Sequence, residues 1–179
     1  GYTDDRIILI VEDDIADNVS NPNKGVIQVT IGGNNVYENV EIDYRMSSLK
    51  AKDILAILNG EKSETLPTVI ESTENDNLFV FWSGHGVPGA MCWDEEPYAM
   101  TGDDLSTVFK DMNLKRRYRK LLMMVEACFS GGVMEQCEGI PGMLFITAAN
   151  GDETSKADVF NGEMKVWMSN RFTSTFIEQ

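Results

Sequence analysis

The sequence has little histidine, little cysteine and few positive charges. Its single histidine is His85, so any histidine-assisted chemistry must use that residue. Its three cysteines, Cys92, Cys128 and Cys137, cannot all pair and lack the doubled Cys-x-x-Cys spacing of a zinc site, so at least one thiol is free. Lys and Arg total 15 against 29 Asp and Glu, a formal net charge of −14. Such an acidic chain is disfavoured as a general nucleic-acid binder or membrane-surface protein.

Long apolar runs and low-complexity tracts are also absent. No apolar run approaches the roughly 20 residues of a membrane span, so we expect no membrane-spanning segment in this sequence. The 179 residues are 42% hydrophobic and 25% charged, with 15 Gly and 5 Pro. These values exclude a disordered or fibrous chain and predict one globular domain with its own core.

Four short apolar runs predict buried parallel strands, at residues 7–11, 78–82, 121–125 and 143–147. Apolar residues at helical spacing predict helices over 48–58, 101–112 and 163–177, the second with Thr101 as its cap. Strands that alternate with helices indicate an open, mostly parallel α/β sheet. Residues 26–40 resemble a β-hairpin with a glycine-rich turn, and residues 61–77 read as a surface loop.

Two of the predicted strands end at residues capable of nucleophilic catalysis. His85 follows the second strand, and Cys128 follows the third. Ligands of parallel sheets bind beyond the carboxyl ends of strands, and neighbouring strands would bring both side chains to the same edge. That placement predicts a Cys/His dyad.

Backbone donors for an oxyanion hole are expected beside both residues. The glycines after Cys128, Gly131 and Gly132, would allow a sharp turn that aims the Cys128 N–H at an acyl oxygen. Gly86 offers a second N–H without a Cβ to obstruct approach. Taken singly, a lone histidine at a strand end is more often structural, and a cysteine among apolar residues is more often inert. Packing is the better explanation of Cys92, and the polar neighbours of Cys137 suggest exposure.

The residues around the dyad resemble a known group of enzymes. A strand that ends in Ser-Gly-His-Gly at Gly86, and another that ends in Glu-Ala-Cys at Cys128, are similar to the caspase–gingipain–legumain group of cysteine peptidases. Within that group the chain looks most like the legumain (asparaginyl endopeptidase) family. The catalytic subunit of the GPI-anchor transamidase is a sister branch, and Glu126 favours the legumain side. Matching blocks, from Gly1-Tyr2-Thr3 to Ala149-Asn150, span nearly the whole chain.

This resemblance implies a fold and an activity. The fold is a caspase/haemoglobinase-like open, mostly parallel sheet flanked by helices on both faces, with residues 1–179 as a single peptidase domain. The activity is a thiol endopeptidase that cleaves after Asn or Asp through an acyl-enzyme, is made as a zymogen, and needs no cofactor or metal. The backbone N–H groups of Gly86 and Cys128 would hold the oxyanion. The implied partner is a peptide or protein substrate.

The resemblance also suggests substrate-binding residues. Glu126 matches a residue that lines the pocket for the substrate side chain before the cleaved bond, with a buried structural acceptor as the equal alternative. Thr154 and Ser155 lie where substrate pairs as an added strand. Asn170 falls near the family's pocket aspartate, a departure that leaves the preferred residue before the cleaved bond open among Asn, Asp and a basic residue.

A larger departure lies at the start of the sequence. Family members carry a further strand and helix before the block that matches Gly1, and these are absent here. A sheet without that central strand would expose unpaired edges. We therefore expect an omitted or separately bound N-terminal segment, or a pro-segment, as a partner.

Three other functions compete with hydrolysis by a dyad. An amine in place of water would make the protein a transpeptidase or ligase with the same dyad. A noncatalytic peptide-binding module on the same fold would not need both His85 and Cys128. A metal site is the weakest alternative, because acidic residues after a strand are more often simply solvated. The acidic residues in question are Glu12, Asp13, Asp14 and Asp17.

Overall fold

The computed structural model describes residues 2–12, 15–28, 32–93, 96–162 and 165–177. The chain falls into two compact units, Gly1–Lys50 and Ala51–Gln179. The second unit contains His85, Cys128 and the other candidate site residues after them. Asp13 and Asp14, named above as metal-ligand candidates, lie outside the described residues.

The first unit has little regular structure in its described residues. A 3-10 turn, η1 (Asp4–Arg6), precedes β1 (Ile10–Val11), which pairs in parallel with β2 (Tyr44–Arg45), and η2 (Met46–Ser48) follows. The strand predicted over 7–11 is thus shortened to its last two residues, and Ile7 is half exposed. In the predicted hairpin, the Val36 N–H donates to the Ile27 carbonyl at 2.8 Å, but the described residues around it form turns. Residues 29–31 of that hairpin lie outside the described residues.

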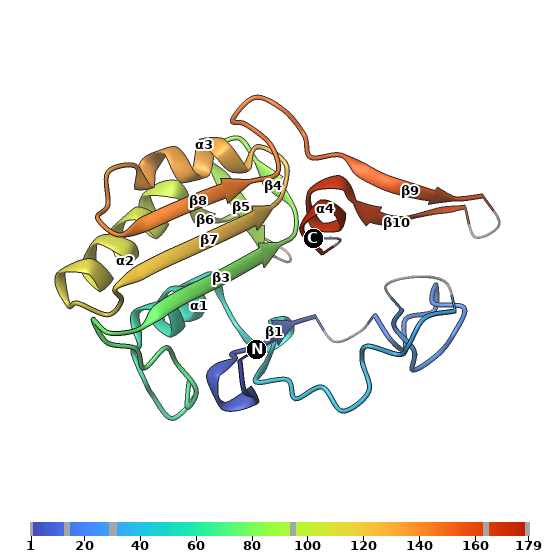
Figure 1. The fold of residues 1–179 in the computed structure, drawn as a ribbon, viewed down its shortest axis with the longest axis horizontal. Coiled ribbons are helices and arrows are strands. Elements are labelled where there is room, and N and C mark those ends of the chain that lie inside the picture. The colour runs from blue at the N-terminus through green and yellow to red at the C-terminus, as the bar shows by residue number, and fades with distance from the viewer. Residues whose placement is uncertain (1, 13–14, 29–31, 94–95, 163–164, 178–179) are drawn as a thin grey trace. The chain divides into compact units, whose positions relative to one another are not determined.

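A three-stranded parallel sheet is the centre of the second unit. The strands β3 (Asn77–Ser83), β7 (Lys120–Glu126) and β8 (Met143–Thr147) lie in the order β3-β7-β8, with β7 in the middle. All three point the same way (Figure 1). They confirm three of the predicted strands and the open parallel α/β sheet.

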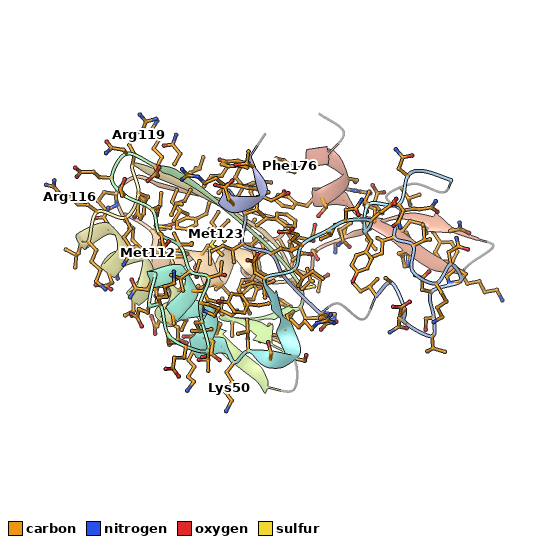
Figure 2. All side chains as sticks on the ribbon, turned by 90° about the horizontal axis from the view of Figure 1, so that it is seen from below. Lys50, Met112, Arg116, Arg119, Met123 and Phe176 are labelled. Carbon is orange, nitrogen blue, oxygen red and sulfur yellow. The ribbon has the colours of Figure 1, made fainter. Side chains whose placement is uncertain are left out.

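One face of this sheet is covered by helices. The helices α1 (Ala51–Asn59), α2 (Gly102–Leu114) and α3 (Ser130–Met134) lie on one side of the strands, as the turned view shows (Figure 2). Alternate side chains of β7 face them, as a pleated strand requires. The fully buried side chains that α2 and β7 contribute include Leu105, Phe109, Met112, Leu121, Met123 and Val125.

The other face of the sheet is more open. Phe79, Phe81, Leu144 and Ile146 are each more than 40% exposed there. The last helix, α4 (Arg171–Ile177), reaches this face, because the ring of Phe176 stacks on that of Phe79 with centroids 6.3 Å apart. The sheet is therefore flanked by helices, with the larger helical layer on one side.

The predicted helix boundaries are mostly confirmed. The Thr101 side chain accepts from the Asp104 N–H and the Asp104 side chain accepts from the Thr101 N–H, a capping box that starts α2. Gly60 adopts a φ of +69° just after α1, the left-handed conformation that commonly ends a helix. Helix α1 begins three residues later than predicted, because residues 46–48 form the 3-10 turn. Residues 61–76 contain no helix or strand, as expected of a loop.

The predicted C-terminal helix is wrong in its first half. Here β9 (Ala157–Asn161) and β10 (Val166–Asn170) form an antiparallel pair, and only α4 is helical. The rings of Phe160 and Trp167, directly opposite each other, meet edge to face with centroids 5.1 Å apart. Such cross-strand aromatic pairs stabilise a hairpin over a helix. Residues 163–164 of the prediction lie outside the described residues.

A small antiparallel sheet between β3 and α2 was not predicted. It consists of β4 (Gly86–Val87), β5 (Ala90–Trp93) and β6 (Glu96–Thr101). A short 3-10 turn, η3 (Glu135–Cys137), follows α3. None of the helices in the described part of the chain is both long enough and apolar enough to cross a membrane.

Candidate active site

The ends of β3 and β7 bring His85 and Cys128 to the same edge of the sheet. The two strands stay in register over their whole length, from Asn77 opposite Lys120 to Ser83 opposite Glu126. The Gly84 N–H then donates to the Glu126 carbonyl at 3.1 Å, which extends the ladder one step beyond the strands. His85 and Cys128 each lie two residues past the last pair. The predicted meeting of the two loops is therefore present.

The backbones of these loops touch at Gly86. A Cβ built on Gly86 would lie 2.2 Å from the carbonyl oxygen of Cys128 and 3.3 Å from the Ala127 Cβ. Real Cβ atoms do not approach a backbone oxygen so closely, so only glycine permits this contact. The loop that carries His85 therefore rests directly on the backbone of Cys128.

The direction of the Gly86 N–H follows from the hairpin that Gly86 begins. Gly86 pairs with Met91, and the neighbouring Cys92 N–H donates to the His85 carbonyl at 3.0 Å. In an antiparallel ladder, hydrogen-bonded and non-hydrogen-bonded pairs alternate. The Gly86–Met91 pair is therefore the non-hydrogen-bonded kind, and the Gly86 N–H points away from β5.

The turn after Cys128 is made by Phe129 rather than by the glycines. Phe129 has a φ of +55°, a left-handed conformation that is uncommon for a bulky residue and costs about 1 kcal/mol or more. Its N–H donates to the Glu153 carbonyl at 2.9 Å, and its carbonyl accepts from the Gly132 N–H at 3.1 Å. This arrangement ends β7 abruptly and starts α3.

Gly131 and Gly132 serve a different purpose from the predicted sharp turn. A Cβ on Gly131 would lie 2.9 Å from the Asn150 Cα, and one on Gly132 would lie 3.2 Å from the Gly151 Cα. The Gly131 N–H also donates to the Ala149 carbonyl at 3.0 Å. The two glycines therefore let the loop after β8 pack closely against the start of α3.

The Cys128 thiol has one polar side chain beside it. Its Sγ lies 3.8 Å from the Ser155 Oγ, and the cysteine is half-buried, whereas His85 is exposed. Thr154, next to Ser155, is exposed, and its hydroxyl accepts from the Lys156 ammonium at 3.4 Å. The structure thus places the predicted residue Ser155, and not Thr154, against the Cys128 sulfur.

Glu126, the last residue of β7, is buried, and only one of its two carboxylate oxygens has a hydrogen-bond partner among the described residues. It is 2% exposed, and its Oε2 accepts from the Thr173 hydroxyl at 3.3 Å. Its Oε1 has no hydrogen-bond partner among the described residues. Buried carboxylate oxygens almost always accept a hydrogen bond, so Oε1 can accept one from a bound ligand.

Asn170 lies on the strand that borders the loop of Ser155. It ends β10, where it pairs with Ala157, two residues after Ser155. The Arg171 N–H donates to the Lys156 carbonyl at 2.9 Å, so the two segments run side by side. Asn170 is half-buried in this arrangement.

Sequence reasoning did not find Thr173. Its hydroxyl reaches Glu126 because α4 folds back toward the end of β7, 47 residues away in sequence. No local pattern announces this contact. The position of Thr173 depends on the β9–β10 hairpin, which was predicted as part of a helix.

Cys137 differs from Cys128 in its burial. Cys128 and Cys137 are both free thiols. Cys137 is fully buried, contrary to the exposure that its polar neighbours suggested, and burial raises its pKa to about 11. Cys137 therefore stays protonated in the neutral range and packs as a small apolar side chain.

Comparisons with known proteins place the chain in a family. The model of the peptidase C13 family matches residues 1–179. The legumain of Rattus norvegicus is 29% identical over 182 residues, which cover 99% of this chain and 41% of that protein. A vacuolar-processing enzyme of Vicia sativa is 35% identical over 161 residues, covering 87% of this chain and 32% of that protein. The hemoglobinase of Schistosoma mansoni is 35% identical over 159 residues, covering 87% of this chain and 36% of that protein. The chain thus spans less than half the length of these relatives.

Proposed function

We propose that this chain, which belongs to the peptidase C13 family, carries the catalytic dyad of a legumain-like cysteine endopeptidase. Cys128 is the nucleophile, and His85 transfers protons. The backbone contact between Gly86 and Cys128 supports this assignment most directly, because it holds the two loops together at the edge where β3 and β7 end.

The proposed reaction begins when the Cys128 thiol gives its proton to His85 and its sulfur attacks the carbonyl carbon of an Asn or Asp residue. The N–H groups of Cys128 and Gly86 stabilise the oxyanion that develops, and His85 protonates the departing amine. The Gly86 N–H suits this task because it points away from β5. Water then attacks the thioester, gives up a proton to His85, and releases the acid and the free thiol.

The proposed pocket for the substrate side chain is built around Glu126. An Asn carboxamide would donate an N–H to the unpartnered Oε1 of Glu126, which removes the cost of leaving that oxygen bare. Ser155, beside the Cys128 sulfur, and Thr154 on the same loop would donate to the carboxamide oxygen or to the substrate backbone. Asn170 supplies an amide rather than a carboxylate, so it can face either an Asn or an Asp side chain.

The natural substrates and bound segments of the whole protein are further proposals. A peptide or protein would enter along residues 152–156, where it would pair as an added strand. We still predict that an N-terminal segment or pro-segment of the protein itself contributes to this unit. Among the described residues, β3 pairs with β7 alone, which leaves its other edge available for such a strand.

The test is a panel of fluorogenic peptides that differ only in the residue before the cleaved bond: Asn, Asp, Arg, Lys and Ala. The intact protein should cleave after Asn or Asp, and Cys128→Ala should abolish turnover while the circular dichroism spectrum stays unchanged. Turnover at the wild-type level in Cys128→Ala would refute the dyad. Cleavage after Arg or Lys alone would refute the pocket. Mass analysis of products with an added amine separates hydrolysis from ligation.

A further inference from the structure

Positive charge is concentrated in one short segment of this acidic chain. Residues 115–120 read Lys-Arg-Arg-Tyr-Arg-Lys, so five of the 15 basic residues fall within six positions. The segment joins the end of α2 to the start of β7. Cys128 follows the other end of the same strand, about 23 Å away at 3.3 Å per residue. The basic segment therefore lies at the opposite edge of the sheet from the candidate active site.

An open cleft borders this segment. Its volume is about 490 Å³, and we call it the basic cleft; it is lined by Ser72, Thr73, Glu74, Lys115, Arg116 and Arg117. Three cations and one carboxylate give the lining a formal charge of 3 − 1 = +2. Both hydroxyls in the lining already donate within the protein, Ser72 to the Arg117 carbonyl and Thr73 to the Asp76 carboxylate. In a chain of net charge −14, such a lining would attract an anion.

Arg116 occupies a backbone position that normally takes glycine. Its φ is +53°, its N–H donates to the Asn113 carbonyl at 3.0 Å, and the Arg117 N–H donates to the Met112 carbonyl at 2.9 Å. These two bonds are the Schellman ending of a helix, in which the left-handed residue is usually Gly. An arginine there costs about 1 kcal/mol more than glycine. Ending the helix therefore does not explain why residue 116 is arginine rather than glycine.

The Arg116 guanidinium is available to a ligand. Its side chain is 78% exposed, and it forms an ion pair with the Glu74 carboxylate at 3.0 Å. Arg116 and Arg119 project outward from the same end of the unit (Figure 2). Exposed pairs of this kind contribute about 0–1 kcal/mol, so an incoming dianion can replace Glu74.

Arg117 has a donor without an acceptor. Its Nη1 donates to the Ile70 carbonyl at 3.2 Å, while its buried Nε has no hydrogen-bond partner among the described residues. A buried donor left bare costs about 1–3 kcal/mol. Arg117 also lines the basic cleft, so its positive charge adds to the attraction for an anion there.

Lys115 stabilises the end of α2 through an ion pair within the helix. It forms an ion pair with Asp111 one turn earlier, and its hydrogen bond, with that of Asn59, lowers the pKa of the Asp111 carboxyl. This pairing accounts for one cation at the end of α2. It leaves the left-handed Arg116 and the bare Nε of Arg117 unexplained.

We propose that the basic cleft binds a phosphate group. A phosphate monoester carries a charge of about −1.5 to −2 at pH 7, which matches the lining better than a single carboxylate does. The exposed Arg116 guanidinium can hold two of its oxygens through paired N–H donors, and Lys115 and Arg117 line the same cleft. The group is carried by a phosphorylated side chain or is free inorganic phosphate. This site acts independently of the proposed peptidase function.

Calorimetric titration of the intact protein tests the proposal, with inorganic phosphate as the first probe at constant ionic strength. Saturable binding that sodium chloride does not reproduce supports it; identical heats from both salts overturn it. A phosphoserine peptide and its unphosphorylated form make the second arm. Tighter binding of the phosphopeptide than of inorganic phosphate identifies a protein-borne source, and equal binding identifies free phosphate.

Three variants make the test specific to the cleft. Arg116→Gly removes the charge while fitting the left-handed backbone, so it should fold normally and weaken phosphate binding about tenfold. Glu74→Gln removes the competing carboxylate and should tighten binding severalfold, which a purely structural role of these residues does not predict. Lys52→Gln, on the exposed side of α1, changes net charge equally and should leave binding unaffected. Equal affinities in all three variants would overturn the proposal.

Discussion

The two ends of the central strands differ in which atoms form their contacts: backbone atoms at the carboxyl ends, and charged side chains at the start of β7. At the carboxyl ends of β3 and β7, backbone meets backbone, and the contact depends on Gly86 having no side chain. At the start of β7, long charged side chains line an open cleft, and Arg116 stands where a glycine would fit the backbone better. The carboxyl end thus depends on a residue without a side chain, Gly86, whereas the basic end depends on long charged side chains such as that of Arg116.

This difference sets how each end should respond to substitution. A backbone contact in a packed interior cannot relax by much, because its neighbours are fixed by the sheet ladder. Long charged side chains can change rotamer in solvent at little cost. Changes at the carboxyl end should therefore have large effects, and changes at the basic end small ones.

Gly86→Ala is the largest expected effect. The new Cβ would lie 2.2 Å from the Cys128 carbonyl oxygen, so the loop that carries His85 must move. A displacement of about 1 Å between catalytic groups costs on the order of a hundredfold in rate. We expect kcat/KM on the best peptide of the panel to fall at least about a hundredfold.

Gly84→Ala is the matched control for that substitution. It lies in the same loop, but its new Cβ would meet only the Trp82 Nε1, at an ordinary 3.6 Å. Its activity should stay within a few fold of the wild type. Equal losses in both variants would mean that the loop tolerates no change at all, and the special status of the Gly86 contact would be lost.

Glu126→Gln probes the buried carboxylate at the same edge. The amide keeps an oxygen for the Thr173 hydroxyl but replaces the other with a donor, which would face the N–H of a substrate carboxamide. We expect about a tenfold loss of kcat/KM for the Asn peptide and no loss for the Asp peptide, whose carboxylate can accept from the new amide.

Thr173→Val separates the pocket role from a structural one. It removes the hydroxyl that holds Oε2 while leaving Oε1 for the substrate. If both variants lose stability to urea and neither changes the ratio of Asn to Asp cleavage, Glu126 is a structural acceptor and not part of the pocket.

The sequence predicted the central sheet because buried parallel strands are continuous apolar runs, and each run also marked its own end. The placement of His85 and Cys128 at one edge followed from β3 and β7 being neighbours. The C-terminal hairpin was missed because the choice between helix and strand over 166–170 depends on pairing with residues 157–161. The role of Gly131 was misjudged for a similar reason, since its close neighbour Asn150 belongs to a distant loop.

The buried thiol of Cys137, in η3, contrasts with the half-buried thiol of Cys128. Burial raises its pKa from 9.0 to about 11, so the folded state holds this proton more tightly than the unfolded state does. Its contribution to stability is therefore complete below about pH 9 and is lost as the pH rises toward 11, by about 2 kcal/mol. Urea unfolding at several pH values should show this loss in the wild type.

Cys137→Ala provides the reference for that loss. The variant lacks the titrating thiol but keeps every lysine and tyrosine that also titrates above pH 9. Its stability should start lower, because a buried sulfur is removed, and should then fall less steeply between pH 9 and 11. Parallel curves for the two proteins would show that the Cys137 thiol does not titrate across this range.

Arg116→Gly is the smallest expected effect and compares the two ends most directly. Glycine adopts a φ of +53° without strain, a gain of about 1 kcal/mol, and the lost ion pair with Glu74 offsets part of it. The free energy of unfolding in urea should rise by a few tenths of a kcal/mol. Peptidase activity should not change, because sites this far apart with no shared partner act additively. A fall in kcat/KM in this stable variant would show that the basic cleft is coupled to Cys128, and the two ends would then be one functional system.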